Sequence, residues 1–257
     1  MQLKNKIVLI TGATSGIGEA CALQFAQAGA KLILCARRLE KLKTLSEKIK
    51  NAFQTAIYYF KCDVQNYEEI KKQFPLIPDE FKDIAILLNN AGLAAGLDEI
   101  QHAAVQDWEQ MIDTNVKGLL YMTREVLPRM IAKNAGHIIN IGSISSHSLY
   151  PKGVVYCATK HAVKALSQGL RMDLFGTKIR VSEVDPGAVE TNFSAVRFKG
   201  DVERAAKVYE GFDPLRAEDI ADAVLYCATR PAHINVSEMI VMPTDQVSVT
   251  MVARQRE

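Results

Sequence analysis

Between residues 11 and 18 the chain reads Thr11-Gly12-Ala13-Thr14-Ser15-Gly16-Ile17-Gly18, and this stretch decides the fold. It follows an apolar strand pattern, Lys6–Ile10, and precedes a helical pattern, Glu19–Ala28. Glycines are needed where backbone turns tightly or approaches a ligand, and a helix N-terminus offers free N–H groups. A glycine-rich turn between a first strand and a first helix therefore predicts a loop that holds a dinucleotide pyrophosphate. A tight turn without a ligand is the alternative.

Beyond this loop, short apolar strand patterns alternate with helical ones. Strands are predicted at Leu32–Ala36, Ala56–Lys61, Ile84–Leu88, His137–Ile141, Ile179–Val184 and Glu238–Met242, and helices near 39–49, 66–74, 105–133, 156–175 and 216–229. Nearly continuous apolar strands joined by helices indicate a parallel sheet that is covered on both faces. Since crossovers are right-handed, we expect an α/β fold with a doubly wound, Rossmann-like sheet.

Composition narrows the class of protein. The 257 residues are 48% hydrophobic and 23% charged, without repeats or a linker, so we expect a single domain over 1–257. A formal charge of +2 gives no reason to expect nucleic acid or an anionic membrane as a partner, and no apolar run is long enough for a membrane span. Five widely spaced cysteines and five histidines without metal spacing predict neither disulfides nor a metal, which suits the cytoplasm.

One segment, 188–214, departs from the alternation because it is polar and shows no strand pattern. A segment this long inside a compact domain is typical of a substrate lid. A surface loop with a short helix is the alternative.

The end of the second strand selects the cofactor. An acid at this place holds a ribose 2′-hydroxyl, whereas an arginine holds a 2′-phosphate. The chain has Arg37 and Arg38 there, with no acid before Glu40. Two guanidiniums pair well with phosphate oxygens, so the sequence predicts NADP. Two exposed arginines at a strand end are the alternative.

A tyrosine and a lysine lie four residues apart near the start of a predicted helix, in Tyr156-Cys157-Ala158-Thr159-Lys160. This spacing puts both side chains on one helical face. A phenol with a pKa near 10 is a poor base at neutral pH, and an ammonium at about 4 Å supplies roughly the energy that lowers this pKa by about 2–3 units. We therefore expect Lys160 to lower the pKa of Tyr156.

Two further polar residues complete a predicted catalytic set. Ser143 ends the fifth strand and can hold the substrate oxygen while Tyr156 exchanges its proton. Asn115 can anchor a water that links Lys160 to solvent. A tyrosine four residues before a lysine occurs by chance in many helices. The catalytic interpretation therefore depends on finding this pair together with the glycine loop and the paired arginines.

The motifs TGATSGIG (11–18), NNAG (89–92), YCATK (156–160) and DPG (185–187), together with Asn115 and Ser143, resemble those of the short-chain dehydrogenase/reductase superfamily. The resemblance runs from residue 6 to about residue 242. It implies seven parallel strands in a single Rossmann-like domain and a homotetramer or, less often, a dimer. It also implies that Asn115, Ser143, Tyr156 and Lys160 are catalytic.

Longer segments, among them His137–Ser143 and Phe193–Asp201, are similar to the NADP-dependent 3-hydroxy acid dehydrogenases. That group oxidises L-allo-threonine, L-serine and other 3-hydroxy acids and reduces malonic semialdehyde. Ser15 is a departure, because many NADP-preferring relatives carry Lys or Arg there, and Asn192 is another, because an acidic residue is expected. Binding of the 2′-phosphate is therefore expected to depend on Arg37 and Arg38.

The cofactor and substrate contacts follow from these motifs. The residues that we expect to contact NADP are Gly12, Thr14, Ser15, Gly16, Ile17, Gly18, Arg37, Arg38, Asp63, Val64, Asn90, Ala91, Gly92, Tyr156, Lys160, Pro186, Gly187, Val189 and Thr191. Ser143 and Arg197 are the expected substrate contacts, with Lys199 and Lys152 as the other cations available for a carboxylate.

The sequence thus predicts a cytoplasmic NADP-dependent dehydrogenase that interconverts a 3-hydroxy acid and its 3-oxo acid by hydride transfer. A 3-oxoacyl-thioester or general carbonyl reductase on the same scaffold is the enzymatic alternative. A non-catalytic NADP-binding protein is the alternative from a different class.

Overall fold

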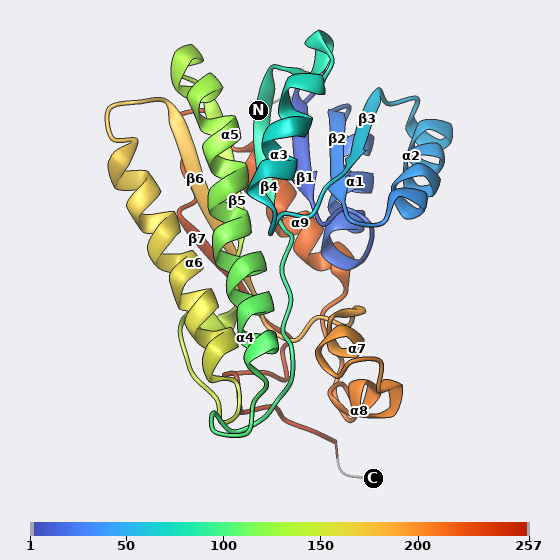
Figure 1. Ribbon diagram of the computed structural model, residues 1–257, viewed down its shortest axis with the longest axis vertical. Helices are drawn as coiled ribbons and strands as arrows, with labels where there is room; N and C mark the ends of the chain where they lie inside the picture. The colour runs from blue at the N-terminus through green and yellow to red at the C-terminus, as the bar shows by residue number, and fades with distance from the viewer. Residues whose placement is uncertain (1–2, 256–257) are drawn as a thin grey trace.

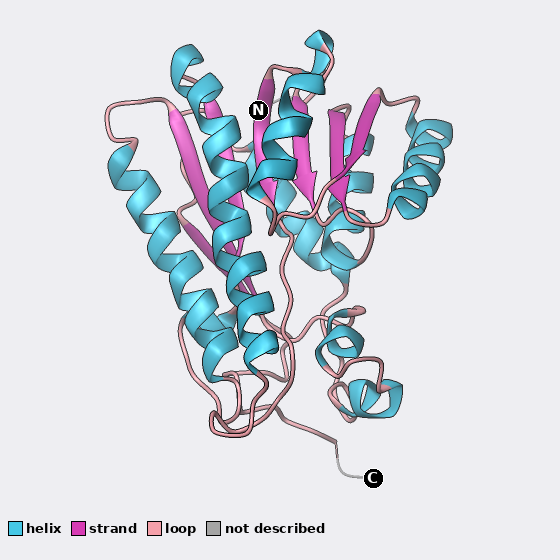
Figure 2. Cartoon of the chain, in the orientation of Figure 1, coloured by secondary structure: helices cyan, strands magenta, loops and turns pink. Residues whose placement is uncertain are grey.

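All strand pairing in the described part of the chain is parallel and lies in one sheet (Figures 1 and 2). The computed structural model describes residues 3–255, so residues 1, 2, 256 and 257 of the predicted domain lie outside the described residues. The strands are β1 (Ile7–Thr11), β2 (Lys31–Ala36), β3 (Ile57–Lys61), β4 (Ile84–Asn89), β5 (Gly136–Ile141), β6 (Ile179–Pro186) and β7 (Glu238–Val241). Their order, β3-β2-β1-β4-β5-β6-β7, confirms the predicted doubly wound fold.

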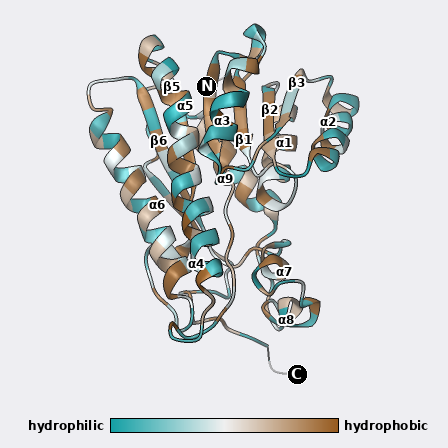
Figure 3. Cartoon of the chain, in the orientation of Figure 1, coloured by the Kyte–Doolittle hydropathy of each residue, from teal (hydrophilic) through white to brown (hydrophobic). Residues whose placement is uncertain are grey.

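Helices cover both faces of this sheet because successive strand residues point to opposite sides. Val8 and Ile10 pack toward α1 (Gly16–Gln27), α2 (Leu39–Phe53) and α9 (Ala217–Thr229). Ile7 and Leu9 pack toward α3 (Tyr67–Gln73), α5 (Leu119–Lys133) and α6 (Val154–Asp173). Figure 3 shows the strands as largely hydrophobic and the helices as striped, as two buried sheet faces require. No helix of residues 3–255 is both long and apolar enough to cross a bilayer.

The helix expected over 105–133 is divided. It comprises α4 (Val105–Ile112), a π-helical turn η3 (Asp113–Gly118) and α5. A Cβ on Gly118 would lie 2.8 Å from Cγ2 of Val64, so the helix passes this loop at a distance that only glycine allows. Single π-helical turns of this kind occur often at functional sites. Here the turn carries Asn115.

The predicted lid segment folds into two short helices, α7 (Phe193–Arg197) and α8 (Val202–Lys207). Figure 1 shows both beyond the carboxyl ends of the strands, apart from the layers of the main body. An isolated parallel bridge between Val189 and Leu215 joins the two ends of the segment. A function as a lid stays a prediction.

Two glycines on helices provide a matched test of this packing. A Cβ on Gly18 would lie 2.5 Å from the carbonyl oxygen of Gly12, whereas a Cβ on Gly169, inside α6, would meet nothing within 4 Å. We expect Gly18→Ala to lower the free energy of unfolding by about 1–3 kcal/mol through overpacking. Gly169→Ala should raise it by about 0.5–1 kcal/mol, because alanine loses less backbone entropy in a helix. Chemical denaturation of both variants measures this, and equal effects would contradict the packing.

Candidate active site

The glycine loop approaches the end of β4 so closely that side chains are excluded. Gly12 and Gly16 have φ of +64° and +54°, the left-handed region that favours glycine. The Asn90 side-chain amide donates to the carbonyl oxygens of Thr11 at 2.9 Å and Gly12 at 3.2 Å. A Cβ on Gly18 would meet the same amide at 2.5 Å. The loop is thus held against the end of β4 by the Asn90 side chain, with the N-terminus of α1 behind it.

Arg38 lies against the loop from the neighbouring strand end. Its Nη2 donates to Thr14 Oγ1 at 2.9 Å and to Ser15 Oγ at 3.1 Å. Arg37 and Arg38 are both exposed and carry no carboxylate partner among the ion pairs of residues 3–255. The pair of guanidiniums is therefore free to bind an anion beside the loop.

A cavity of about 510 Å³ runs from the glycine loop to Tyr156 at the carboxyl ends of the strands. It is lined by all the predicted cofactor and substrate residues except Gly18, and by every predicted catalytic residue except Asn115. Gly18 does not line the cavity, but its lack of a side chain lets the helix lie against the carbonyl of Gly12. Open α/β sheets bind ligands at this edge, where the strand order reverses.

The four predicted catalytic residues converge from three elements: Asn115 lies in η3, Ser143 follows β5, and Tyr156 and Lys160 lie on α6. Asn115, buried in η3, accepts from the Leu93 amide at 2.8 Å and donates to the Leu93 carbonyl at 2.8 Å. Lys160 Nζ donates to the Ile141 carbonyl at 2.9 Å. A Cβ on Gly92 would lie 3.3 Å from Asn115 Oδ1 and 3.6 Å from Lys160 Nζ, so the two side chains face the same glycine.

The expected effect of Lys160 on Tyr156 is wrong for this arrangement. Burial raises the pKa of Tyr156, and a hydrogen bond with Ser143 and the charge of Arg197 only partly oppose it. Lys160 Nζ lies 6.0 Å from the centroid of the phenol ring, and burial lowers the pKa of Lys160 itself to about 8. The phenol is therefore the proton-carrying form at neutral pH, because desolvation disfavours the phenolate.

Among the three candidate cations, geometry separates Arg197 from the other two. Arg197 lines the cavity, with its guanidinium carbon 5.8 Å from the Tyr156 ring centroid. It donates to Tyr150 Oη at 2.8 Å and to the Gly96 carbonyl at 3.1 Å. Lys199 instead pairs with Asp107 at 2.9 Å, and Lys152 lines only a much smaller hollow.

Several cavity residues were missed by the sequence reasoning. Phe193 packs edge-on against Tyr156 at 5.7 Å between centroids, and Tyr150 anchors Arg197. Tyr209 donates to the Val189 carbonyl and hydrogen-bonds Ser194 within the lid segment. The sequence signals that could have found them are the aromatic residues themselves: Tyr150, six positions before Tyr156, and Phe193 and Tyr209 in the lid segment. Gln246, whose side-chain oxygen accepts a hydrogen bond from the Ala188 N–H, could not be recognised from the sequence.

The comparisons with known proteins agree with this geometry. Residues 6–201 match the model of the short chain dehydrogenase family. The chain is similar to the NADP-dependent 3-hydroxy acid dehydrogenase YdfG of Salmonella typhi, with 48% identity over 241 residues, 93% of this chain and 96% of that protein. It is also similar to the NADP-dependent 3-hydroxy acid dehydrogenase of Schizosaccharomyces pombe, with 41% identity over 99% of each chain.

Among solved structures, the chain resembles the closed form of a serine dehydrogenase complexed with NADP+, with a TM-score of 0.91, 45% identity, and coverage of 97% of this chain and 100% of that one. A serine dehydrogenase from Escherichia coli matches with a TM-score of 0.82 and 42% identity, over 94% of this chain and 99% of that one. The predicted family is confirmed: this chain belongs to the short chain dehydrogenases.

Proposed function

We propose that this chain is an NADP-dependent oxidoreductase that acts on the CH–OH group of 3-hydroxy acids and reduces the corresponding 3-oxo acids. The observation that carries the proposal is that Arg197 and Tyr156 face one cavity, with 5.8 Å between the guanidinium carbon and the phenol ring centroid. A carboxylate held by the guanidinium fork places a hydroxyl two carbons away within reach of the phenol. The names of the similar dehydrogenases support the same reaction and cofactor.

The residues present fit NADP. Gly12 and Gly18 leave space that a Cβ would fill, and Ser15, the N-cap of α1, makes no side-chain bond to the helix. The free N–H groups of this helix would bind the pyrophosphate, and Arg37 and Arg38 the 2′-phosphate. When bound, NADP supplies the hydride donor or acceptor.

In the proposed mechanism, the phenol of Tyr156 donates its proton to the carbonyl oxygen during reduction. For oxidation the phenol first releases its proton toward Lys160 and solvent, and the resulting phenolate then takes the proton of the hydroxyl. Ser143 holds the same oxygen, and its hydrogen bond to Tyr156 keeps the two groups together. Lys160, whose pKa is lowered to about 8 by burial, supports proton exchange beside Asn115. Phe193 and Tyr150 exclude water from the phenol.

Two other functions remain as alternatives to be tested. A 3-oxoacyl-thioester or general carbonyl reductase would use the same proton donor without a carboxylate. A non-catalytic NADP-binding protein would use the glycine loop alone. The lid function of 188–214, the single domain, the homotetramer and the cytoplasmic location stay predictions.

Substitution of the proton donor tests the reaction. With NADP⁺, wild type should turn over L-serine, L-allo-threonine and 3-hydroxyisobutyrate faster than a simple alcohol or a 3-hydroxyacyl thioester. Tyr156→Phe should lower kcat by about 10²-fold or more, because the proton has no donor. Tyr226→Phe, on the exposed side of α9, is the matched control. Turnover of thioesters alone would favour the first alternative, and NADPH binding without any turnover the second.

Cofactor preference is tested by exchanging Arg37 for Asp and Arg38 for Ser together. Two charge-assisted contacts are lost and a repelling carboxylate is gained, so the ratio of kcat/KM for NADP over NAD should fall by about 10²-fold or more. Lys41→Glu together with Lys43→Met, at two exposed positions on α2, lowers the net charge by the same amount and is the control. An unchanged ratio would refute the assignment of the 2′-phosphate.

The carboxylate contact is tested by Arg197→Met. Loss of a hydrogen-bonded cation should raise KM for the hydroxy acid by about 10-fold or more, with little change for an uncharged secondary alcohol. Lys199→Met removes a neighbouring lid charge that is already paired with Asp107 and should leave both KM values near wild type. Equal increases for acid and alcohol would argue against Arg197.

A further inference from the structure

A buried carboxylate lies directly behind the active site, on the strand that precedes the lid. Asp185, at the end of β6, is completely buried. Its Oδ1 accepts the backbone N–H of Ser143 at 3.0 Å, and a Cβ on Gly142 would lie only 1.8 Å from the same oxygen. On the other side of this short segment, Lys160 Nζ donates to the carbonyl of Ile141. Residues 141–143 are therefore fixed by two hydrogen bonds: the Lys160 ammonium donates to the carbonyl of Ile141, and the Asp185 carboxylate accepts from the amide of Ser143.

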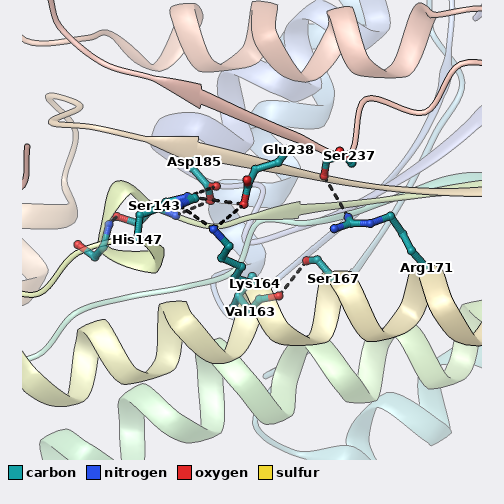
Figure 4. A network of polar contacts seen from close by, with 10 residues as sticks. Ser143, His147, Val163, Lys164, Ser167, Arg171, Asp185, Ser237 and Glu238 are labelled. Carbon is teal, nitrogen blue, oxygen red and sulfur yellow. Dashed lines mark hydrogen bonds and ion pairs between the residues drawn. The ribbon is translucent and has the colours of Figure 1, made fainter. Parts of the chain in front are cut away.

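A chain of polar contacts holds this carboxylate from the far side (Figure 4). Asp185 Oδ2 lies 2.8 Å from His147 Nε2, and His147 Nδ1 lies 2.7 Å from Lys164 Nζ. Lys164 Nζ pairs with Glu238 Oε1 at 3.1 Å. Since an ammonium can only donate, Nδ1 accepts and the imidazole proton is on Nε2, where it donates to Asp185. This fixes the histidine tautomer and gives Asp185 two hydrogen-bond donors.

The charges in the cluster compensate one another when Asp185 is ionised. The charged and titratable groups that face it are Glu183 on β6, Glu238 on β7, Lys160 and Lys164 on α6, and His147 after the turn Ile144–Ser146. Burial and then the Asp185 charge raise the pKa of Glu183 to about 8, so Glu183 keeps its proton. Asp185 then balances Lys160, and Glu238 balances Lys164.

The same cluster offers a metal three potential ligand atoms, on His147, Asp185 and Glu238, within 4.8 Å of one another. The Lys164 ammonium already bonds two of these side chains. This positive charge beside the cluster disfavours a second cation. The cluster instead pairs the charged and polar side chains of the protein with one another.

We infer that Asp185 is a positioning residue for the reaction: it fixes the backbone of Ser143 and is the buried counter-ion that keeps Lys160 protonated. His147 and Lys164 hold Asp185 in this state. The role in catalysis rests on the proposed function, whereas the charge coupling does not. Two observations support the coupling. Both groups bond the same segment, residues 141–143, and among the neighbouring charges Asp185 has the largest effect in raising the pKa of Lys160, ahead of Glu183.

Asp185→Asn removes the charge and keeps the size of the side chain. Its amide oxygen can still accept the Ser143 N–H, whereas its amide nitrogen replaces the oxygen that accepts from His147 Nε2. Lys160 should then lose its proton at lower pH, with its pKa falling from about 8 by about one unit. The titration is followed in full-length protein by NMR of lysine labelled with ¹³C at Cε, and the signal is assigned as the one absent from Lys160→Arg. His161→Gln, the next residue along α6, removes a histidine that hydrogen-bonds the Cys157 carbonyl of its own helix and is the matched control.

His147 provides a second pair of variants. His147→Gln can still donate to Asp185, whereas His147→Leu cannot and leaves the carboxylate short of a donor. His147→Leu should therefore show part of the Asp185→Asn shift in Lys160, because a more basic Asp185 competes for the proton. His147→Gln should stay close to wild type. Circular dichroism checks that each variant is folded.

The activity profile gives an independent readout. The alkaline limb of kcat should move to lower pH in Asp185→Asn by the same amount as the Lys160 pKa, with recovery of kcat at the lower pH. A uniform loss of kcat at every pH, or an unshifted Lys160 titration in Asp185→Asn, would overturn the inference. A shifted Lys160 titration in a protein that turns over no hydroxy acid would instead refute the proposed function and leave the charge coupling intact.

Discussion

The structure depends on the close approach of two backbone segments at the carboxyl end of the sheet. A Cβ on Gly12 would lie 2.9 Å from the Cα of Ala91, and the Asn90 amide bonds two carbonyls of the facing loop. This contact joins β1 and β4, the two neighbouring strands at which the strand order of the sheet reverses. The turn, the helix behind it and the mouth of the cavity all take their positions from it. Polar side chains and glycine, rather than apolar packing, make the contact.

Burial decides the chemistry more than the local sequence does. Tyr156 and Lys160 have the spacing that predicts an acidic phenol, yet the phenol is enclosed by Phe193 and Tyr150 and its pKa is raised. Burial disfavours the charged phenolate of Tyr156. The Lys160 ammonium, 6.0 Å from the ring centroid, does not offset this effect. Ser143 and Arg197 supply the opposing effects, and both are fixed by contacts with distant parts of the chain.

The motifs that resemble the family predicted many of the residues that line the cavity, and strand periodicity and glycine spacing were sufficient to predict the order of elements. Both signals are local, and the crossover rule turns them into one topology. Three features were beyond such signals. The π-helical turn at Asp113–Gly118 lies against Val64, from a distant loop. The choice of Arg197 over Lys199 depends on the pairing of Lys199 with Asp107. The Asp185 cluster forms where β6, β7 and α6 meet. Each requires residues far apart in the sequence to be neighbours.

The bridge between Val189 and Leu215 has an evolutionary consequence. It brings the two ends of a 25-residue excursion together at the rim of the sheet, so the intervening chain contributes no strand to the core. Insertions, deletions and wholesale replacements within it can be accommodated without disturbing the scaffold. Because the segment also carries Phe193 and Arg197, which lie against Tyr156, its replacement would change substrate selectivity and the surroundings of the proton donor together.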